Sequence, residues 1–367
     1  MTAGPPQEHP LRDNLSTLAV IILAAFALHM ASGHLDGYRI QILNLVAINA
    51  ILALSLNFIY GFSGMFSLGH AGFMAVGAYV SALCILSPAQ KEMLWILEPI
   101  LSPLAGLHTP FVASVLLGGL AAALLSFLVA LPVMRLGGDY LGIATLGFAE
   151  IIRVLFTNLS PITNGAIGLR GIPPYADLRT NYSWLLVTLF VILSILKSNF
   201  GNVLKSIRDD EIAARTMGIN TTAYRTMAFC VGGFFAGVGG ALMGSLVTTI
   251  DPKMFGFLLT FNIMLIVVAG GLGSVTGSLV GSAVITILLE WLRLVEEPTT
   301  IGPLELPGIP GMRMVIFSLA LMMIILFRRQ GLLGAREFSW AAFYGFWGRL
   351  PANLKNRGRR PGPGRRP

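Results

Sequence analysis

Long uninterrupted runs of apolar residues constrain this chain more than any other feature of its sequence. About ten such runs are long enough to cross a hydrocarbon core of roughly 30 Å as helices. Their apolarity is continuous rather than alternating, which favours helices over the strands of a membrane barrel. The sequence therefore predicts an all-α, polytopic transmembrane helix bundle with spans at 15–32, 40–60, 65–86, 111–134, 139–157, 183–198, 224–249, 256–272, 275–295 and 311–328.

The distribution of basic residues predicts how these spans are oriented. Cytoplasmic loops of membrane proteins carry an excess of Lys and Arg. If the N-terminus is cytoplasmic, 17 of the 25 basic residues fall on cytoplasmic segments, seven on external segments, and Arg153 lies inside a span. We therefore expect both termini in the cytoplasm, external loops at 87–110 and 158–182, and a cytoplasmic segment at 197–224.

Three regions are expected along the chain. Residues 1–14 form a cytoplasmic N-terminal tail, residues 15–335 form the transmembrane domain with a cytoplasmic loop at 199–222, and residues 336–367 form a basic tail. The Pro, Gly and Arg residues of the C-terminal tail cannot bury a core, so we predict that it is largely disordered. Its position next to the last span suits contact with anionic membrane lipid.

Composition and motifs argue against several classes of function. Seven of the 25 basic residues lie from residue 349 onward, so the formal charge of +8 indicates a topology anchor rather than a nucleic-acid-binding protein. The sequence contains no GK[ST], HExxH or CxxC motif. Cys84 and Cys230 both lie inside apolar runs and predict no disulfide framework. We expect no catalytic residues, bound cofactor or metal, so any uphill transport would draw its energy from elsewhere.

Two membrane-depth segments are interrupted by Gly and Ser, at 61–79 and at 269–282. A pair of such segments in separate parts of a transporter indicates a transport pathway. The alternative is that small residues simply let helices pack closely. The spacing of four between Gly233 and Gly237, and between Gly240 and Gly244, fits the packing interpretation.

A charged stretch, NVLKSIRDDEIAARTMGIN at 202–220, separates two long apolar runs. We predict a short helix over 200–207 and a second one capped by Asp209 or Asp210, whose carboxylates accept the exposed N–H groups. Gly218 suits a left-handed position after that helix, and Asn220, Thr221 or Thr222 can cap the next span. An apolar stripe of four residues would give this segment a docking ridge, formed by Val203, Ile207, Ala214 and Met217. The alternative is a solvated loop between helices.

Several segments resemble one family of membrane proteins. The stretch IRDDEIAARTMGIN is similar to the cytoplasmic loop of ABC importer permeases, in which a Glu-Ala-Ala element followed by Gly contacts the ATPase. The chain as a whole resembles the LivM-type permease subunit of branched-chain amino acid transporters. The resemblance covers roughly 35–335 and is carried by GFSGMFSLGHAGFMAVGAY (61–79), GGDYLGIATLGFAEIIR (137–153), NGAIGLRGIPP (164–174), VVAGGLGSVTGSLVGS (267–282) and LFRRQGLLG (326–334).

This resemblance implies an ATP-driven importer of leucine, isoleucine and valine in the bacterial cytoplasmic (inner) membrane that works by alternating access. The implied partners are a second, LivH-type permease subunit, two LivG/LivF-type ATP-binding subunits that use the ATP, and an external solute-binding protein. The family's ATPase-coupling element corresponds here to Glu211, Ala213, Ala214 and Gly218, with Ile212 inserted. The complete coupling set that we predict is Arg208, Asp209, Asp210, Glu211, Ala213, Ala214 and Gly218.

Polar residues at membrane depth are candidates for the translocation path, because such residues are costly and rarely incidental. The candidates are Asn57, Ser63, Ser67, His70, Thr145, Glu150 and Asn262. Glu150 and Arg153 are three residues apart on one helical face, so a structural ion pair is the alternative interpretation.

Other functions remain open at this stage. A sugar or urea/amide ABC permease would share the same architecture, and a stand-alone secondary transporter could couple to protons through Glu150 or His70. A membrane scaffold without transport would tolerate replacement of Glu211 and Gly218.

Overall fold

The computed structural model describes residues 36–95, 99–135, 138, 140–296, 299–301, 304–306, 311–327, 331–332 and 334. Five helices in this part of the chain are long and apolar enough to cross a membrane. They are α2 (Gly37–Asn57) with its π-helical extension η1 (Phe58–Phe62), α6 (Phe111–Val133), α7 (Tyr140–Asn158), α9 (Leu178–Lys197) and α12 (Thr221–Val247). The predicted helical membrane bundle is therefore confirmed, while the predicted count of about ten spans and the location of the termini are not. The predicted span at 15–32 and both tails lie outside the described residues.

Helix α12 lies at the centre of the bundle and packs against α6, α2 and α3 (His70–Ile85). Its glycines allow these close approaches. A Cβ atom on Gly237 would collide with Ala122 of α6, and one on Gly240 would collide with the Met74 backbone of α3. Gly77 of α3 lies directly against the Gly237 backbone. Small residues commonly let membrane helices pack this closely, so the packing interpretation accounts for these glycines.

Non-helical backbone at two places, residues 63–69 and residues 271–274, changes the bounds of three predicted spans. Residues 63–69 are not helical, so α3 begins only at His70 instead of near residue 65. At its other end α3 bends by 118° into α4 (Pro88–Leu94). The predicted spans 256–272 and 275–295 are the shorter helices α13 (Phe257–Gly270) and α14 (Val275–Trp291), which meet at a bend of 119° around residues 271–274.

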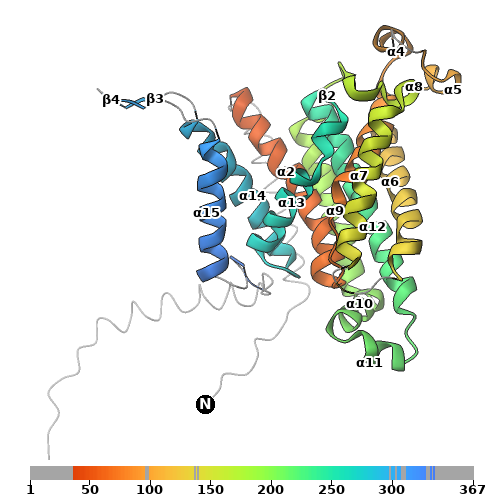
Figure 1. The fold of residues 1–367 in the computed structure, drawn as a ribbon, viewed down its shortest axis with the longest axis vertical. Coiled ribbons are helices and arrows are strands. Elements are labelled where there is room, and N and C mark those ends of the chain that lie inside the picture. Colours follow the sequence, from red (N-terminus) through yellow and green to blue (C-terminus); the bar gives the residue numbers. More distant parts are fainter. Residues whose placement is uncertain are drawn as a thin grey trace, which may run out of the picture. The chain divides into compact units, whose positions relative to one another are not determined.

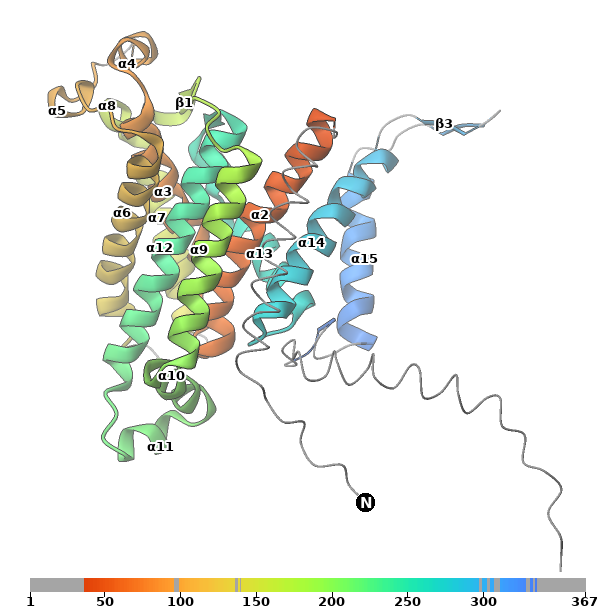
Figure 2. The ribbon, with the colours of Figure 1, turned by 180° about the vertical axis from the view of Figure 1, so that it is seen from behind.

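Short elements gather at the two ends of the bundle (Figures 1 and 2). One end carries α4, α5 (Ser102–Ala105), α8 (Ser160–Thr163), η2 (Gly165–Ile167) and the antiparallel pair β1 (Leu169–Arg170) and β2 (Thr249–Ile250). The opposite end carries α10 (Asn199–Asp209) and α11 (Glu211–Thr216). The two predicted external loops therefore lie at the other end of the bundle from the predicted cytoplasmic segment. The remaining elements are η3 (Pro252–Phe255), η4 (Leu292–Val295), the hairpin β3 (Thr299–Ile301) and β4 (Leu304–Leu306), and α15 (Met312–Phe327).

Lys91 organises the end that carries α4 and α5. Its side chain is fully buried, and Nζ donates hydrogen bonds to the carbonyl oxygens of Leu104 at 2.7 Å and Leu107 at 2.5 Å. Burial lowers the pKa of Lys91 below its usual value, because desolvation disfavours the charged ammonium. The two carbonyls compensate part of that cost and fix the loop between α4 and α6.

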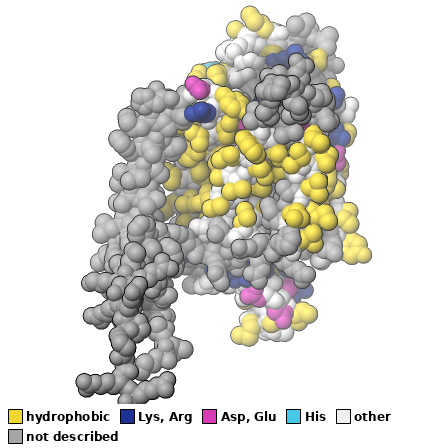
Figure 3. Space-filling view, turned by 90° about the vertical axis from the view of Figure 1, so that its left-hand side faces the viewer, with side chains coloured by type: hydrophobic (Ala, Val, Ile, Leu, Met, Phe, Trp, Pro, Cys, Tyr) yellow, Lys and Arg dark blue, Asp and Glu magenta, His cyan; other side chains and the backbone are white. Residues whose placement is uncertain are grey.

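The outer face of the bundle is apolar in its middle. Helix α6 exposes Leu120, Leu124 and Leu128. On the face shown in Figure 3, hydrophobic side chains gather in the middle of the described part, and charged side chains lie above and below them. This pattern is that of a protein surrounded by hydrocarbon.

Candidate functional site

The α10–α11 segment (199–222) has the local structure that its sequence predicts. Asp210 is the N-cap of α11, and its Oδ1 accepts hydrogen bonds from the backbone N–H groups of Ile212 at 2.9 Å and Ala213 at 3.0 Å. Gly218 adopts a left-handed φ of +82°. Asn220 caps α12 by accepting from the Ala223 N–H at 3.1 Å. Each of these roles is satisfied by residues within three positions along the chain, which is why sequence alone could predict them.

Glu211 ties α11 back to the start of α12. Its carboxylate is paired with Arg215 Nη2 at 2.5 Å and with Arg225 Nη1 at 2.7 Å. The Arg225 side chain is only 16% exposed, so this second pair is partly desolvated. Arg215 Nε also donates to Thr221 Oγ1 at 3.1 Å. The network holds α11 in a defined orientation against the first turns of α12, because moving α11 would separate several charges at once.

The predicted apolar docking stripe is wrong in its composition. Ile207 and Ala214 are buried against the rest of the protein, with 1% and 4% exposure, and Val203 is half-buried. Of the four predicted residues only Met217 is well exposed, at 82%, and the other large exposed apolar side chain of this segment is Ile212, at 77%, which was not predicted. A stripe at helical spacing faces the nearest apolar surface, which here is the bundle itself. The outward surface of α11 consists of Ile212, Ala213, Thr216 and Met217, and the exposed Arg215 lies at its edge.

Arg208 connects α10 to the membrane-embedded part of the bundle. Its Nη1 donates to the carbonyl oxygen of Gly61 at 3.1 Å, at the end of α2, while Nε and Nη2 bind Asp209 Oδ1 at 3.0 and 2.9 Å. The Gly273 backbone lies beside the same guanidinium. The two Gly-interrupted segments predicted at 61–79 and 269–282 therefore meet at Arg208.

Asn57 joins the same two segments from inside the bundle. Its Nδ2 donates to Ser274 O at 2.9 Å and to Ser278 Oγ at 2.8 Å, and its Oδ1 accepts from Gly273 N–H at 2.9 Å. The side chain is fully buried. Three short hydrogen bonds in a buried setting fix the 271–274 bend against α2.

The non-helical segment before α3 is held by side chains from two other helices. Thr145 Oγ1 of α7 accepts from the Leu68 N–H at 3.0 Å, and Thr260 Oγ1 of α13 accepts from the Ala71 N–H at 2.9 Å. His70 Nε2 lies 2.8 Å from Ser55 Oγ of α2, and its buried Nδ1 has no partner within the described chain. These contacts replace the helical hydrogen bonds that residues 63–69 do not make.

The candidate path residues fall into two groups. Those that are buried at 2% exposure or less hold elements together, and they are Asn57, Ser63, Ser67, His70 and Thr145. Ser63 Oγ bonds Phe58 O at 2.9 Å, and Ser67 Oγ accepts from Gly69 N–H at 3.4 Å. Glu150 and Asn262 are only partly buried. A role in translocation remains a prediction for all seven.

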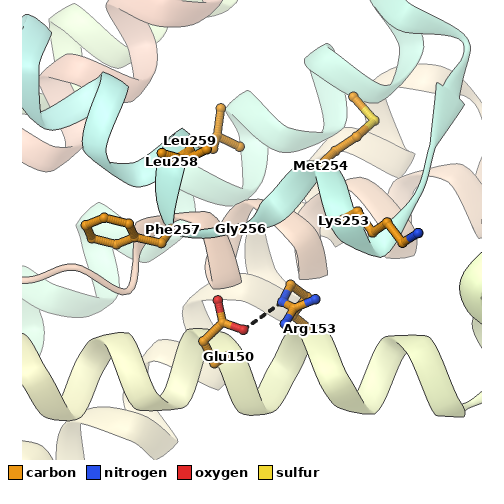
Figure 4. A pocket seen from close by; sticks show the side chains of 8 residues that line it. All are labelled: Glu150, Arg153, Lys253, Met254, Gly256, Phe257, Leu258 and Leu259. Carbon is orange, nitrogen blue, oxygen red and sulfur yellow. Dashed lines mark hydrogen bonds and ion pairs between the residues drawn. The ribbon is translucent and has the colours of Figure 1, made fainter. Parts of the chain in front are cut away.

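Glu150 lies beside a cavity of about 240 Å³ between α7 and the η3–α13 segment (Figure 4). Its Oε2 accepts from Arg153 Nε at 2.7 Å, and the two side chains remain 40% and 34% exposed. The other lining residues are Lys253, Met254, Gly256, Phe257, Leu258 and Leu259. Figure 4 shows the Glu150 carboxylate directed from α7 toward the start of α13. The predicted ion pair is present, and it faces a cavity.

The sequence model of one protein family matches residues 38–326, and that family is described as "Branched-chain amino acid transport system / permease component". The chain belongs to this permease family. The matched region runs from the start of α2 into α15 and so includes both the α10–α11 segment and the cavity beside Glu150.

Individual relatives agree with the family. The chain is 30% identical to the high-affinity branched-chain amino acid transport system permease protein LivM of Salmonella typhimurium, over 78% of this chain and 70% of the relative. The same values apply to LivM of Escherichia coli. A nucleoside ABC transporter permease protein, NupC of Lactococcus lactis, is 28% identical over 49% of this chain and 58% of its own. No solved structure matches.

Sequence reasoning missed four residues that organise this permease. Arg225 and Thr221 complete the Glu211 network, Thr260 supports the start of α3, and Lys253 stands at the cavity. Arg225 carries a recognisable signal, because a base in the first turns of a long apolar span requires a partner. Thr260 and Lys253 carry none, since their neighbours lie far away in the sequence.

Proposed function

We propose that this chain is a permease subunit of an ATP-driven importer that moves branched-chain amino acids into the cytoplasm by alternating access. The observation that carries the proposal is the family match over 38–326, together with five apolar spanning helices. The proposed partners are a second permease subunit, two ATP-binding subunits that hydrolyse the ATP, and an external solute-binding protein. The proposed location is the bacterial cytoplasmic membrane.

In this proposal the α10–α11 segment is the contact with an ATP-binding subunit. Ile212, Ala213 and Met217 are the exposed apolar residues of this contact, and the exposed charges of Asp209 and Arg215 in the same segment would set its orientation. Apolar anchors surrounded by charge are typical of a helix that docks into a groove. The Glu211 network keeps α11 rigid, so a displacement imposed on α11 is passed to α12 instead of being absorbed by the loop.

Arg208 and Asn57 supply a second route for the same displacement. A movement of α10 pulls on the Gly61 carbonyl through Arg208, and Asn57 links the adjoining end of α2 to the 271–274 bend. Both broken segments of the membrane domain are thereby connected to the proposed ATPase contact. Broken segments suit such a role, because their non-helical backbone can rearrange without unwinding a full helix.

The test is co-expression of the chain with its partner subunits, followed by purification and leucine uptake in vesicles. We expect Ile212→Asp with Met217→Asp to abolish co-purification of the ATP-binding subunits and to lower uptake at least about tenfold, because two apolar anchors are lost. Met93→Asp is the matched control, since Met93 is 74% exposed on α4 at the opposite end. Normal co-purification of the double variant, or leucine uptake by the chain alone, would contradict the proposal.

A nucleoside is the second candidate substrate, and the relative from Lactococcus lactis is the observation that favours it. The same vesicles decide between the two. Uptake of leucine that uridine does not inhibit assigns the chain to amino acid import, and the reverse pattern assigns it to nucleoside import.

A further inference from the structure

The cavity between α7 and the η3–α13 segment carries an unusual combination of side chains for membrane depth. Glu150 is the eleventh of the 19 residues of α7, so at 1.5 Å per residue it lies roughly 12–15 Å from either end of that helix. Glu150 and Arg153 are nevertheless about one-third or more exposed. A charged pair exposed to hydrocarbon at that depth is costly, and such groups normally face water or the interior of an assembly. We therefore expect the α7–α13 flank to face water or a neighbouring subunit rather than hydrocarbon.

The chemistry of the cavity is that of a zwitterion with an aliphatic side chain. Glu150 uses Oε2 for Arg153, which leaves Oε1 open to an ammonium group. Arg153 uses Nε, which leaves its two terminal nitrogens open to a carboxylate, and the exposed Lys253 supplies a second cation. Met254, Phe257 and Leu258 form an apolar wall beside these charges.

The size and the position of the cavity support the same ligand. A volume of about 240 Å³ is below the roughly 300–1,000 Å³ of sites for drug-sized ligands, so it suits a molecule no larger than an amino acid. Helix α13 begins here at Phe257 after Gly256, with no side-chain cap on its first N–H groups. These N–H groups add positive potential beside the Glu150 carboxylate, which is directed toward the start of α13, and so help to hold that carboxylate in place.

We propose that this cavity is a binding subsite for the amino acid in transit, with the ammonium group at Glu150, the carboxylate at Arg153 and Lys253, and the aliphatic side chain against Met254 and Leu258. This assignment rests on the proposed import function. The subsite holds the head group that every α-amino acid shares, so it contributes selection for zwitterions and leaves the choice among side chains to the external binding protein.

Vesicles containing the complete importer, its binding protein and radiolabelled leucine test the proposal, with leucine imported per ATP hydrolysed as the readout. We expect Lys253→Gln and Glu150→Gln each to lower this ratio at least about tenfold, as for one lost charge-assisted hydrogen bond. In the exchanged pair, Glu150→Arg with Arg153→Glu, the ratio of leucine imported to ATP hydrolysed should be as low as in the single variants. The exchange keeps an ion pair but reverses the positions of the charges that bind the ligand.

The controls separate this proposal from a structural ion pair and from the import function itself. Glu290→Gln alters another Glu–Arg pair at spacing three, between Glu290 of α14 and Arg293 of η4 and outside the cavity, and should leave the ratio unchanged. Recovery of import in the exchanged pair, or normal import in Lys253→Gln, would show that Glu150 and Arg153 act only on structure. Loss of assembly in the Glu150 variants with normal import in Lys253→Gln would overturn the subsite in the same way. Absence of leucine import by the unmodified complex would refute the import function instead.

Discussion

Asn57 shows how much of this protein depends on single buried polar side chains. All three of its hydrogen bonds go to residues 273–278, more than 200 positions away, and none of its atoms is exposed. Inside a membrane protein such side chains hold two segments together, because separating the segments would leave buried polar atoms without partners, which costs free energy. The buried Thr260 does the same for Ala71, and Arg208, whose side chain is 36% exposed, makes a similar long-range bond to the Gly61 carbonyl.

Replacing Asn57 by Ala should therefore destabilise the protein. The change leaves the buried Gly273 N–H without its partner, at a cost on the order of 1–3 kcal/mol, whereas the Ser274 carbonyl keeps its bonds from the N–H and Oγ of Ser278. The expected result is a lower midpoint of thermal unfolding in detergent. Asn158→Ala is the control, because Asn158 is exposed and bonds only Val154 O in its own helix. Equal unfolding midpoints for the two variants would show that the hydrogen bonds of Asn57 do not stabilise the protein.

At the scale of elements, close packing around α12 is set by glycine. Gly77 of α3, Gly118 of α6 and Gly237 of α12 meet backbone to backbone where the three helices are closest. Glycine lowers helix propensity by up to about 1 kcal/mol relative to Ala. This cost is offset by the contact between neighbouring backbones, which larger side chains would prevent.

Two glycine substitutions in helix interiors separate these effects. Gly77→Ala should lower stability by several kcal/mol, or prevent assembly of the bundle, because its Cβ collides with rigid Gly237 backbone. Gly147→Ala on α7 should be neutral or stabilising by up to about 1 kcal/mol, because nothing lies near its Cβ. Thermal unfolding of both purified variants checks this, and a Gly77→Ala protein as stable as Gly147→Ala would refute the packing argument.

At the scale of the whole molecule, the two broken segments converge. The first turns of α3 and α13 are linked by the bond from Ala71 to Thr260, and the bend before α14 adjoins the end of α2 and Arg208. Short chains of contacts thus connect the two backbone breaks with the proposed subsite on α13 and with the proposed ATPase contact on α10 and α11. A transporter requires such a connection, because energy applied at one end must change access at another.

The orientation of the bundle is a separate prediction. In a variant with Cys84 and Cys230 replaced by Ser, a membrane-impermeant maleimide added to intact cells should label Met93→Cys, because α4 is expected outside. In cells that express this chain without the ATP-binding subunits, which would cover α11 in the proposed complex, Ile212→Cys should react only after permeabilisation, because α11 is expected in the cytoplasm. Both positions are well exposed, at 74% and 77%, so a lack of labelling reports the side of the membrane. Labelling of Ile212→Cys in intact cells would invert the orientation.

The features that depend on nearby residues could be predicted from the sequence alone. Continuous apolarity predicted the helices, and Asp210, Gly218 and Asn220 predicted the caps of the α10–α11 segment, because a cap is satisfied within one turn. The ion pair of Glu150 with Arg153 belongs to the same class, since both side chains lie on one helical face.

The other features depend on contacts between residues that are far apart in the sequence. Residues 65–69 were predicted as helix from their apolar composition, yet helix α3 starts at His70. Thr145 of α7 binds the Leu68 N–H of the non-helical stretch, and Thr260 of α13 binds the Ala71 N–H in the first turn of α3. Ala214 was predicted to be part of the docking surface, but it is buried and Ile212 is exposed, because the bundle covers one side of α11. Glu150 lines a cavity because the start of α13 lies next to it. Each outcome depends on which distant groups arrive next to a residue, and no local pattern records that.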